Sequence, residues 1–90
     1  MGRFSVELTK GARKSLAKLD SSVANVIVNW IAKNLNNCEN PRAHGKPLTG
    51  NLRDQWSYRI GDYRIIAQIV DERVLILVLS VDHRSEAYRR

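Results

Sequence analysis

Three alternating segments towards the end of this 90-residue chain constrain its fold more than any other feature. They are Gln55–Ile60, Tyr63–Val70 and Arg73–Val81, and only Gly61–Asp62 and Asp71–Glu72 separate them. Alternation with period two is typical of strands, and two-residue connections have the length of tight hairpins. Glycine in the first turn position favours a type II′ turn. The three segments therefore predict an antiparallel meander.

A strand and two helices are predicted before the meander. Phe4–Leu8 alternates as a strand does, and Thr9 offers a helix N-cap. Apolar residues then recur at helical spacing on two successive faces: Ala12, Leu16 and Leu19, then Val23, Val26, Ile27, Trp30, Ile31 and Leu35. The short joint Leu19–Ser22, where Asp20, Ser21 or Ser22 can cap the second helix, predicts an antiparallel helical hairpin.

The predicted fold class is therefore α+β. An N-terminal strand is followed by the helical hairpin, which packs on the meander, and residues 84–90 form a short C-terminal helix or a tail. A chain of this length makes one domain, so residues 1–90 are expected to be a single unit. Asn34–Gly50 is rich in turn residues and is predicted to be an irregular connection, of a length often associated with function.

The expected location is the cytoplasm. The segment after Met1 has no apolar stretch of the kind found in a signal peptide. The longest apolar run, Val74–Leu79, is far too short to span a membrane. Cys38 is the only cysteine, so no internal disulfide can form.

The net charge of +6 favours a polyanionic partner, although a basic surface also aids solubility. Lys10, Lys14 and Lys18 are spaced by four residues on the first predicted helix, where like charges repel weakly. This basic ridge is either an RNA contact or a solvated helix face.

Closing both hairpins on two-residue loops fixes a predicted register. Arg59 then lies opposite Arg64, and Arg64 lies opposite Leu79. If the alternation continues, Val81 and His83 join the face of the two arginines. Directly opposed like charges are destabilising, whereas a phosphate between two guanidinium groups reverses the effect. The pair is therefore interpreted as a phosphate clamp, with two solvated arginines as the alternative.

No metal site or cofactor is expected, because the two histidines are far apart and no carboxylates cluster with them. A metal-free ribonuclease is chemically feasible, since it needs charge stabilisation at the phosphate and groups that move protons. Arg59 and Arg64 are candidates for the first role, and His83 is a candidate for the second. Other residues that could contact or orient RNA are Lys46, His44, Arg84 and Tyr88.

Three motifs together resemble a known family. They are Pro41–Gly50, Trp56–Arg64 and Asp82–Tyr88, and their order and spacing are similar to those of a RelE-type toxin of a bacterial toxin–antitoxin pair, in the RelE/ParE superfamily. The resemblance implies an endonuclease that cleaves mRNA in the ribosomal A site by attack of the 2′-OH, without metal or cofactor. It also implies three partners: the ribosome, mRNA and an antitoxin that masks the cationic face or displaces the C-terminal segment.

Carried over by position, Arg64 resembles the arginine that holds the scissile phosphate, and Arg84 resembles a second arginine near the leaving group. Tyr88 resembles a tyrosine that stacks on a substrate base. Arg59 and Lys46 resemble cations that contact RNA, and His83 matches a position of histidine or lysine. The ridge of Lys10, Lys14 and Lys18 would face ribosomal RNA.

Two positions depart from the family pattern. A lysine pair of some members is replaced here by Ser57 and Arg59, and no glutamate lies in the loop at residues 42–50. The general base is therefore assigned to His83, with His44 as the second candidate. Two other functions stay open: inhibition of DNA gyrase by a toxin of the same fold, and a non-catalytic RNA-binding module.

Overall fold

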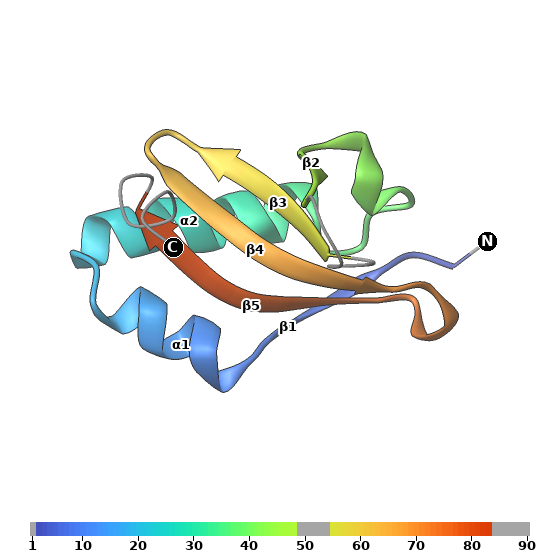
Figure 1. Cartoon of the computed structure of the whole chain (residues 1–90), viewed down its shortest axis with the longest axis horizontal. Coiled ribbons are helices and arrows are strands. Elements are labelled where there is room, and N and C mark those ends of the chain that lie inside the picture. Colours follow the sequence, from blue (N-terminus) through green and yellow to red (C-terminus); the bar gives the residue numbers. More distant parts are fainter. Residues whose placement is uncertain (1, 49–54, 84–90) are drawn as a thin grey trace.

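The computed structural model of the chain describes residues 2–48 and 55–83. Its helices, 3-10 turns (η) and strands follow one another along the chain (Figure 1) in this order: β1 (Ser5–Leu8), α1 (Lys10–Ala17), α2 (Ser21–Asn34), η1 (Pro41–Ala43), β2 (Lys46–Pro47), β3 (Gln55–Ile60), β4 (Tyr63–Val70), η2 (Asp71–Arg73) and β5 (Leu75–His83).

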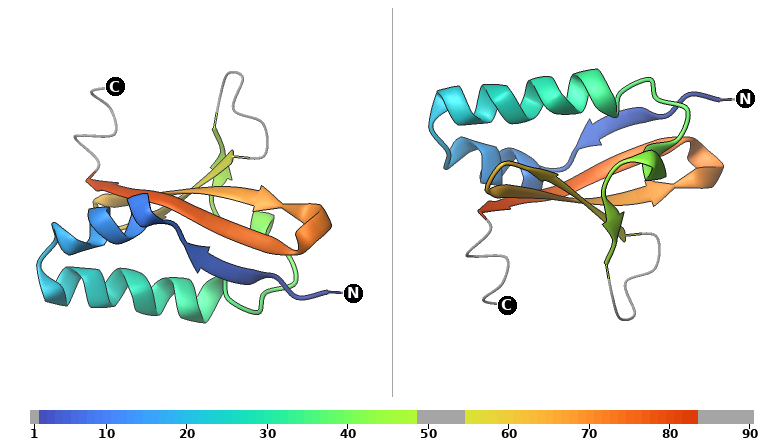
Figure 2. Two further views of the ribbon diagram at one scale, coloured as in Figure 1. Left: turned by 90° about the horizontal axis from the view of Figure 1, so that it is seen from below. Right: turned by 90° about the horizontal axis from the view of Figure 1, so that it is seen from above.

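The five strands form one sheet in the order β1-β5-β4-β3-β2. β1 is parallel to β5, and the other neighbours are antiparallel. α1 and α2 both lie on the same face of the sheet, and neither covers the opposite face (Figure 2). The α+β prediction of a strand, a helical hairpin and a meander is therefore confirmed. The predicted C-terminal helix or tail lies outside the described residues.

The helices begin close to where the sequence predicts. The Thr9 side chain accepts a hydrogen bond of 3.2 Å from the Ala12 amide, which confirms the expected cap of α1. Asp20 occupies the N-cap position of α2 without a side-chain cap bond. Gly11 lets α1 approach β5 closely, because a Cβ at this position would lie 2.8 Å from the Leu79 carbonyl oxygen.

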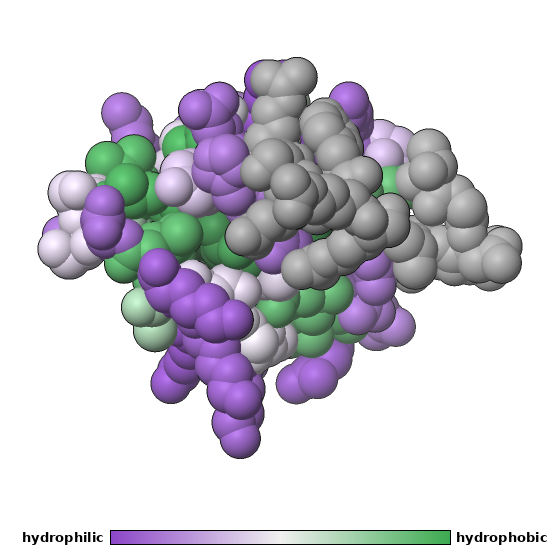
Figure 3. Space-filling model, turned by 60° about the vertical axis from the view of Figure 1, so that its left-hand side comes forward, coloured by the Kyte–Doolittle hydropathy of each residue, from purple (hydrophilic) through white to green (hydrophobic). Residues whose placement is uncertain are grey.

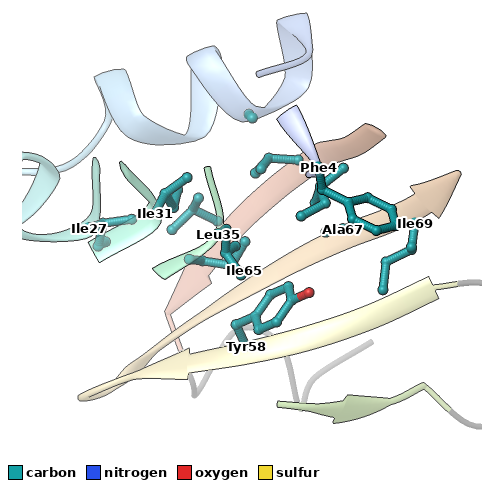
Figure 4. Packing of buried hydrophobic residues seen from close by; sticks show 12 residues of the cluster. Phe4, Ile27, Ile31, Leu35, Tyr58, Ile65, Ala67 and Ile69 are labelled. Atoms are coloured by element: carbon teal, nitrogen blue, oxygen red, sulfur yellow. The ribbon is translucent and has the colours of Figure 1, made fainter. Parts of the chain in front are cut away.

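The core lies between the helical pair and the sheet (Figure 4). Its buried side chains come from the residue before β1, both helices, the C-cap of α2 and the three meander strands: Phe4, Ala12, Ile27, Ile31, Leu35, Tyr58, Ile65, Ala67, Ile69, Ile76, Val78 and Val81. Each large member contributes about 1.5–3 kcal/mol through the removal of apolar surface from water. Within the described residues, no helix is long and apolar enough to cross a membrane.

The first hairpin of the meander agrees with the prediction. Ile60 faces Tyr63 and Arg59 faces Arg64, as counted from a two-residue loop. Gly61 has a φ of 58°, whereas Asp62 is not among the residues with positive φ. That combination is the pattern of a type II′ turn, which matches the twist of the flanking strands.

The second hairpin differs from the prediction. Asp71–Arg73 forms a 3-10 turn and Val74 adopts a left-handed conformation with φ of 50°, so Val70 pairs with Leu75 rather than Arg73. The register also shifts between Ile66 and Ala67, where β5 contains an extra residue.

The shift moves the end of β5 to the other side of the sheet. Arg64 faces Asp82 instead of Leu79, and Tyr63 faces His83. Val81 is buried in the core. The prediction that Val81 and His83 join the arginine face is therefore wrong, because one extra residue inverts the alternation.

The predicted irregular connection contains ordered elements. η1 and the short strand β2 lie within it, and β2 pairs with β3 so that Lys46 faces Ser57 and Pro47 faces Trp56. A two-residue strand with proline at an edge gives no periodic signal, which explains why the sequence pattern did not indicate it.

Candidate functional site

A small cationic pocket lies on the face of the sheet that α1 and α2 leave uncovered. It has a volume of about 210 Å³, and its walls come from the end of the connection and from three adjacent strands: Gly45, Lys46, Ser57, Arg59 and Arg64. Three of these five residues are cations and none is a carboxylate. The predicted clamp residues Arg59 and Arg64 are thus brought together with Lys46.

The two arginines are direct cross-strand partners at the end of the hairpin. Arg59 is exposed, and its Nε donates a long hydrogen bond of 3.4 Å to the Gly61 carbonyl oxygen. Arg64 is only partly exposed and has Asp82 as its partner on β5. Arg64 therefore lies in register between Arg59 on β3 and Asp82 on β5. Asp82 thus lies on the same face of the sheet as the two arginines.

Gly45 determines how Lys46 enters the pocket. Its φ of 71° is a conformation that favours glycine, and a Cβ at this position would collide with the Ser57 carbonyl oxygen. The backbone of the connection therefore lies directly against β3, and Lys46 follows at the pocket wall.

Two side chains of β3 anchor the segment that carries Lys46. The Trp56 indole N–H donates to the His44 carbonyl oxygen at 2.6 Å, and the Tyr58 hydroxyl donates to the Pro41 carbonyl oxygen at 2.7 Å. Burial raises the pKa of Tyr58, so its hydroxyl keeps the donated proton. The segment is thus attached to β3 at both ends of its 3-10 turn.

A forked ion pair forms the third anchor. Both terminal nitrogens of Arg42 donate to the carboxylate of Asp71 at 2.9 Å, which ties the segment to the connection between β4 and β5. These hydrogen bonds from Arg42 lower the pKa of the Asp71 carboxyl. The Arg42 guanidinium also lies 5.8 Å from the centre of the Trp56 ring, at cation–π distance.

Neither histidine lines the cationic pocket. The His44 ring packs edge-on against Trp30 of α2, with 5.9 Å between ring centres. The His83 ring packs edge-on against Tyr63 at 5.1 Å, on the face opposite the arginines. The structure therefore separates both candidates for the general base from the arginine pair.

His83 lines a larger recess of about 520 Å³ between α1 and the end of β5. Lys18, Tyr63 and Asp82 also line it. This recess joins one end of the lysine ridge to the end of β5.

The lysine ridge lies away from the cationic pocket. Lys10, Lys14 and Lys18 are all exposed on or just after α1, which packs on the other face of the sheet. In Figure 3, hydrophilic side chains project from the lower part of the molecule, where α1 lies. The ridge and the pocket are therefore two separate cationic surfaces.

Two predicted site residues, Arg84 and Tyr88, lie outside the described residues. Two observations were not predicted: Ser57 lines the pocket, and Asp82 lies opposite Arg64 on β5. Ser57 lies two residues before Arg59 in the predicted strand, so the alternation placed both on the same face of the sheet. The pairing with β2, which encloses Ser57, gave no signal in the sequence. In the described ranges, no three histidine, cysteine or acidic side chains gather as metal ligands would.

The fold and the pocket define a class of small basic α+β proteins with a cationic site on the uncovered face of the sheet. A family model described as the ParE toxin of the type II toxin–antitoxin system parDE matches residues 6–88. Toxin RelG of Mycobacterium tuberculosis is 36% identical over 87 residues, which are 97% of this chain and 98% of the relative. The chain thus belongs to the RelE/ParE family of toxins of type II toxin–antitoxin systems.

Solved structures agree with this assignment. A chain in the crystal structure of the toxin–antitoxin complex RelBE2 from Mycobacterium tuberculosis has a TM-score of 0.83 at 34% identity, over 94% of this chain and 95% of that chain. The isolated RelE toxin of E. coli has a TM-score of 0.71 at 27% identity, over 97% of both chains.

Proposed function

We propose that this toxin is a ribosome-dependent endonuclease that cleaves mRNA in the A site by metal-independent attack of the 2′-OH. The observation that carries the proposal is the convergence of Lys46, Arg59 and Arg64 on one small pocket. Three cations and no carboxylate at its wall fit the charge of a phosphodiester. The curated relatives named toxins RelG and RelE support the RelE branch of the family.

In the proposed reaction, the 2′-OH gives its proton to a base and its oxygen attacks phosphorus. The bond from phosphorus to the 5′-oxygen breaks, the 5′-oxygen takes up a proton, and a 2′,3′-cyclic phosphate forms. Negative charge grows on the phosphate oxygens during this step. Arg64 and Arg59 stabilise that charge, and Lys46 holds the strand through a further phosphate contact. Arg84 acts near the leaving oxygen and Tyr88 stacks on a base, as the family resemblance implies.

Proton transfer is assigned to His83, with His44 as the second candidate. His83 is the last residue of β5 and the cross-strand partner of Tyr63, and its ring packs against Tyr63 on the face opposite the arginines. A substrate strand that passes around this end of the sheet would reach both the arginines and the imidazole. The pH profile of cleavage by His83→Gln, compared with that of His44→Gln, tests which ring moves the proton.

The proposed partners are the ribosome, mRNA and a cognate antitoxin, in the cytoplasm, where translation occurs. Relatives have been crystallised as toxin–antitoxin complexes, including RelBE2 of Mycobacterium tuberculosis. A protein antitoxin that covers the cationic pocket would exclude RNA. Both exposed cationic surfaces of this chain, the pocket and the ridge on α1, favour an acidic partner.

The decisive experiment compares naked mRNA with the same mRNA on programmed ribosomes, in the presence of EDTA. We expect cleavage only on ribosomes, at the A-site codon, with 2′,3′-cyclic phosphate ends. If folded protein cleaves the mRNA in neither sample, the proposal is contradicted.

Substitution of Arg64 tests the phosphate contact. We expect Arg64→Ala to fold normally and to cleave roughly 100-fold more slowly or worse, since loss of one charge-stabilising donor has an effect of that order. Arg73→Ala, an exposed arginine in η2, is the matched control. Full toxicity of a folded Arg64→Ala variant would remove the clamp from the mechanism.

DNA gyrase inhibition is the second candidate, because the matching family model carries the ParE name. The two functions differ in what they need from the site. Gyrase inhibition requires no cleavage chemistry, so His83→Gln would leave it intact. A gyrase supercoiling assay with the purified toxin separates the two.

A further inference from the structure

Ser57 is the only buried polar or charged side chain among the residues that the structure describes, with 4% of its surface exposed. It lies in the wall of the cationic pocket, on the strand that also supplies Arg59 and between the strands that supply Lys46 and Arg64. Its position is therefore unusual in two respects: it is shielded from bulk water, and it faces a cavity.

The hydroxyl of Ser57 has a weak internal partner. In the described part of the chain it makes one hydrogen bond, to the Lys46 carbonyl oxygen, at 3.5 Å. Hydroxyl donors usually approach their acceptors to about 2.7–2.8 Å, and buried polar groups nearly always have such partners. The Ser57 hydroxyl thus makes only a long hydrogen bond within the protein, and it can donate to a better-placed acceptor in the pocket.

The neighbours of Ser57 indicate what that acceptor is. Lys46 lies directly opposite Ser57 across β2 and β3, and Arg59 follows two residues later on the same face of β3. Arg64 is the cross-strand partner of Arg59. Any anion held by the three cations therefore lies beside the serine hydroxyl.

The volume of the pocket limits the size of the bound group. Sites for drug-sized ligands commonly have about 300–1,000 Å³, and this pocket has about 210 Å³. It suits a phosphate group with part of its ribose better than a complete nucleotide. The pocket would therefore bind the RNA backbone and leave base recognition to other residues.

We propose that the Ser57 hydroxyl is a direct hydrogen-bond donor to the phosphodiester bound between Lys46, Arg59 and Arg64. The inference rests on the proposed RNA function of this pocket. Ser57 is a neutral donor in a cationic site, so its contribution does not depend on the release of counterions. Loss of the hydroxyl weakens binding equally at low and high salt, whereas loss of a cation also reduces the salt dependence.

The test measures binding of the full-length toxin to a short single-stranded RNA whose riboses are 2′-O-methylated, so that it cannot be cleaved. We expect Ser57→Ala to bind about tenfold more weakly at every salt concentration, as for loss of one hydrogen bond to a charged group. Ser57→Thr keeps the hydroxyl and should bind within about twofold of the wild type.

Ser80→Ala is the matched control. Ser80 and Ser57 are both cross-strand partners of Ile66, so they lie in one row on the same face of the sheet. The Ser80 hydroxyl contacts Asp82 at 3.4 Å and does not line the cationic pocket. This variant should bind the RNA as the wild type does.

A folded Ser57→Ala variant with wild-type affinity would overturn the inference. Should that variant fail to fold, the wild-type toxin can be titrated with inorganic phosphate and observed by NMR. Saturable shifts of the Ser57 and Lys46 amide signals support the inference, and unchanged Ser57 signals contradict it. Tight RNA binding that depends on Ser57, without ribosomal cleavage, would refute the nuclease proposal and leave the role of Ser57 intact.

Discussion

At the scale of single residues, the opposed pair of Arg59 and Arg64 is a local conflict between stability and binding. Two like charges directly across a pair of strands destabilise it by about 0.2–1 kcal/mol. The carboxylate of Asp82, on the other side of Arg64, reduces the repulsion for one member of the pair only. A bound phosphate would relieve it for both.

Removal of one charge should therefore stabilise the free toxin. We expect Arg59→Gln to raise the free energy of unfolding by a few tenths of a kcal/mol up to about 1 kcal/mol, because the repulsion is lost. The same variant should bind uncleavable RNA more weakly. Urea denaturation and RNA titration measure the two effects, and Arg13→Gln on α1 is the control. A destabilised Arg59→Gln variant would mean that the pair is not repulsive.

Gly45 and Gly61 allow a second comparison between two residues. Both have positive φ, of 71° and 58°, but a Cβ on Gly45 meets the Ser57 carbonyl oxygen, whereas a Cβ on Gly61 meets nothing within 4 Å. We expect Gly61→Ala to cost about 1–2 kcal/mol through its backbone alone. Gly45→Ala should cost more and should displace Lys46. Equal losses in thermal or urea unfolding would show that the segment can move away from β3 freely.

Much of the site could be predicted at this scale, because the pairing of its two arginines depends on the adjacent turn alone. A two-residue turn with glycine first fixes the register of its own hairpin, so the opposition of Arg59 and Arg64 followed from counting. Lys46 was a candidate because it lies in the loop just before the meander, and the family resemblance gave it the role of an RNA contact. Ser57 was not predicted, because its burial depends on a strand of two residues that no periodicity indicates.

At the scale of elements, the segment from Pro41 to Pro47 depends on anchors rather than on its own hydrogen bonds. Its 3-10 turn and two-residue strand are too short to be stable alone. Trp56, Tyr58 and the forked pair of Arg42 and Asp71 hold it on the sheet. The position of Lys46 in the pocket is a consequence of these contacts.

The ion pair gives this anchoring a pH dependence. The lowered pKa of Asp71 means that its carboxylate stabilises the fold above the pKa of the unfolded chain, near 4, and loses this contribution as the pH falls through the folded value. We expect the difference in unfolding free energy between the wild type and Asp71→Asn to be constant from pH 7 to about 5 and to vanish in acid. Both side chains are partly exposed, so the difference should be below about 1 kcal/mol.

Urea unfolding at a series of pH values measures this difference. Asp62→Asn, in the other hairpin, is the control and should show no comparable loss. A difference for Asp71→Asn that grows towards low pH would have the wrong sign for a depressed carboxyl pKa.

The second hairpin shows why the pairing of two strands is harder to predict than the strands themselves. The residues of β4 were predicted as observed, and β5 was displaced by two residues at its ends. The sequence Asp71–Val74 contains no glycine to indicate a left-handed residue, yet Val74 adopts that conformation. The extra residue in β5 lies in an unbroken apolar run, where neither face has a distinguishing pattern. The prediction therefore placed His83 on the face of the arginines, whereas the structure has it on the opposite face.

At the scale of the whole molecule, the sheet separates two cationic surfaces. The pocket lies on one face, and the lysines of α1 lie beyond the other. We expect a short RNA strand to bind mainly at the pocket, whereas a ribosome can surround the protein.

Salt dependence separates the two surfaces. For single-stranded RNA, each lost phosphate contact should reduce the slope of log K against log salt by about 0.7. We expect this reduction for Lys46→Gln with a short uncleavable RNA, and no change for Lys10→Gln or Lys14→Gln. On ribosomes, the α1 variants should bind more weakly as well. A reduced slope for Lys10→Gln with the short RNA would show that one strand contacts both surfaces.

The parallel pairing of β1 with β5 has a consequence for synthesis of the toxin. Ser5 pairs with Leu75, so a strand that leaves the ribosome early must wait for one that is made about 70 residues later. Until then, β4 lacks one neighbour, α1 lacks the strand on which it packs, and closure of so long a loop is slow. The sheet that carries the cationic pocket therefore stays incomplete until β5 has been made. Under the proposed function, this delay would protect the ribosome that makes the toxin.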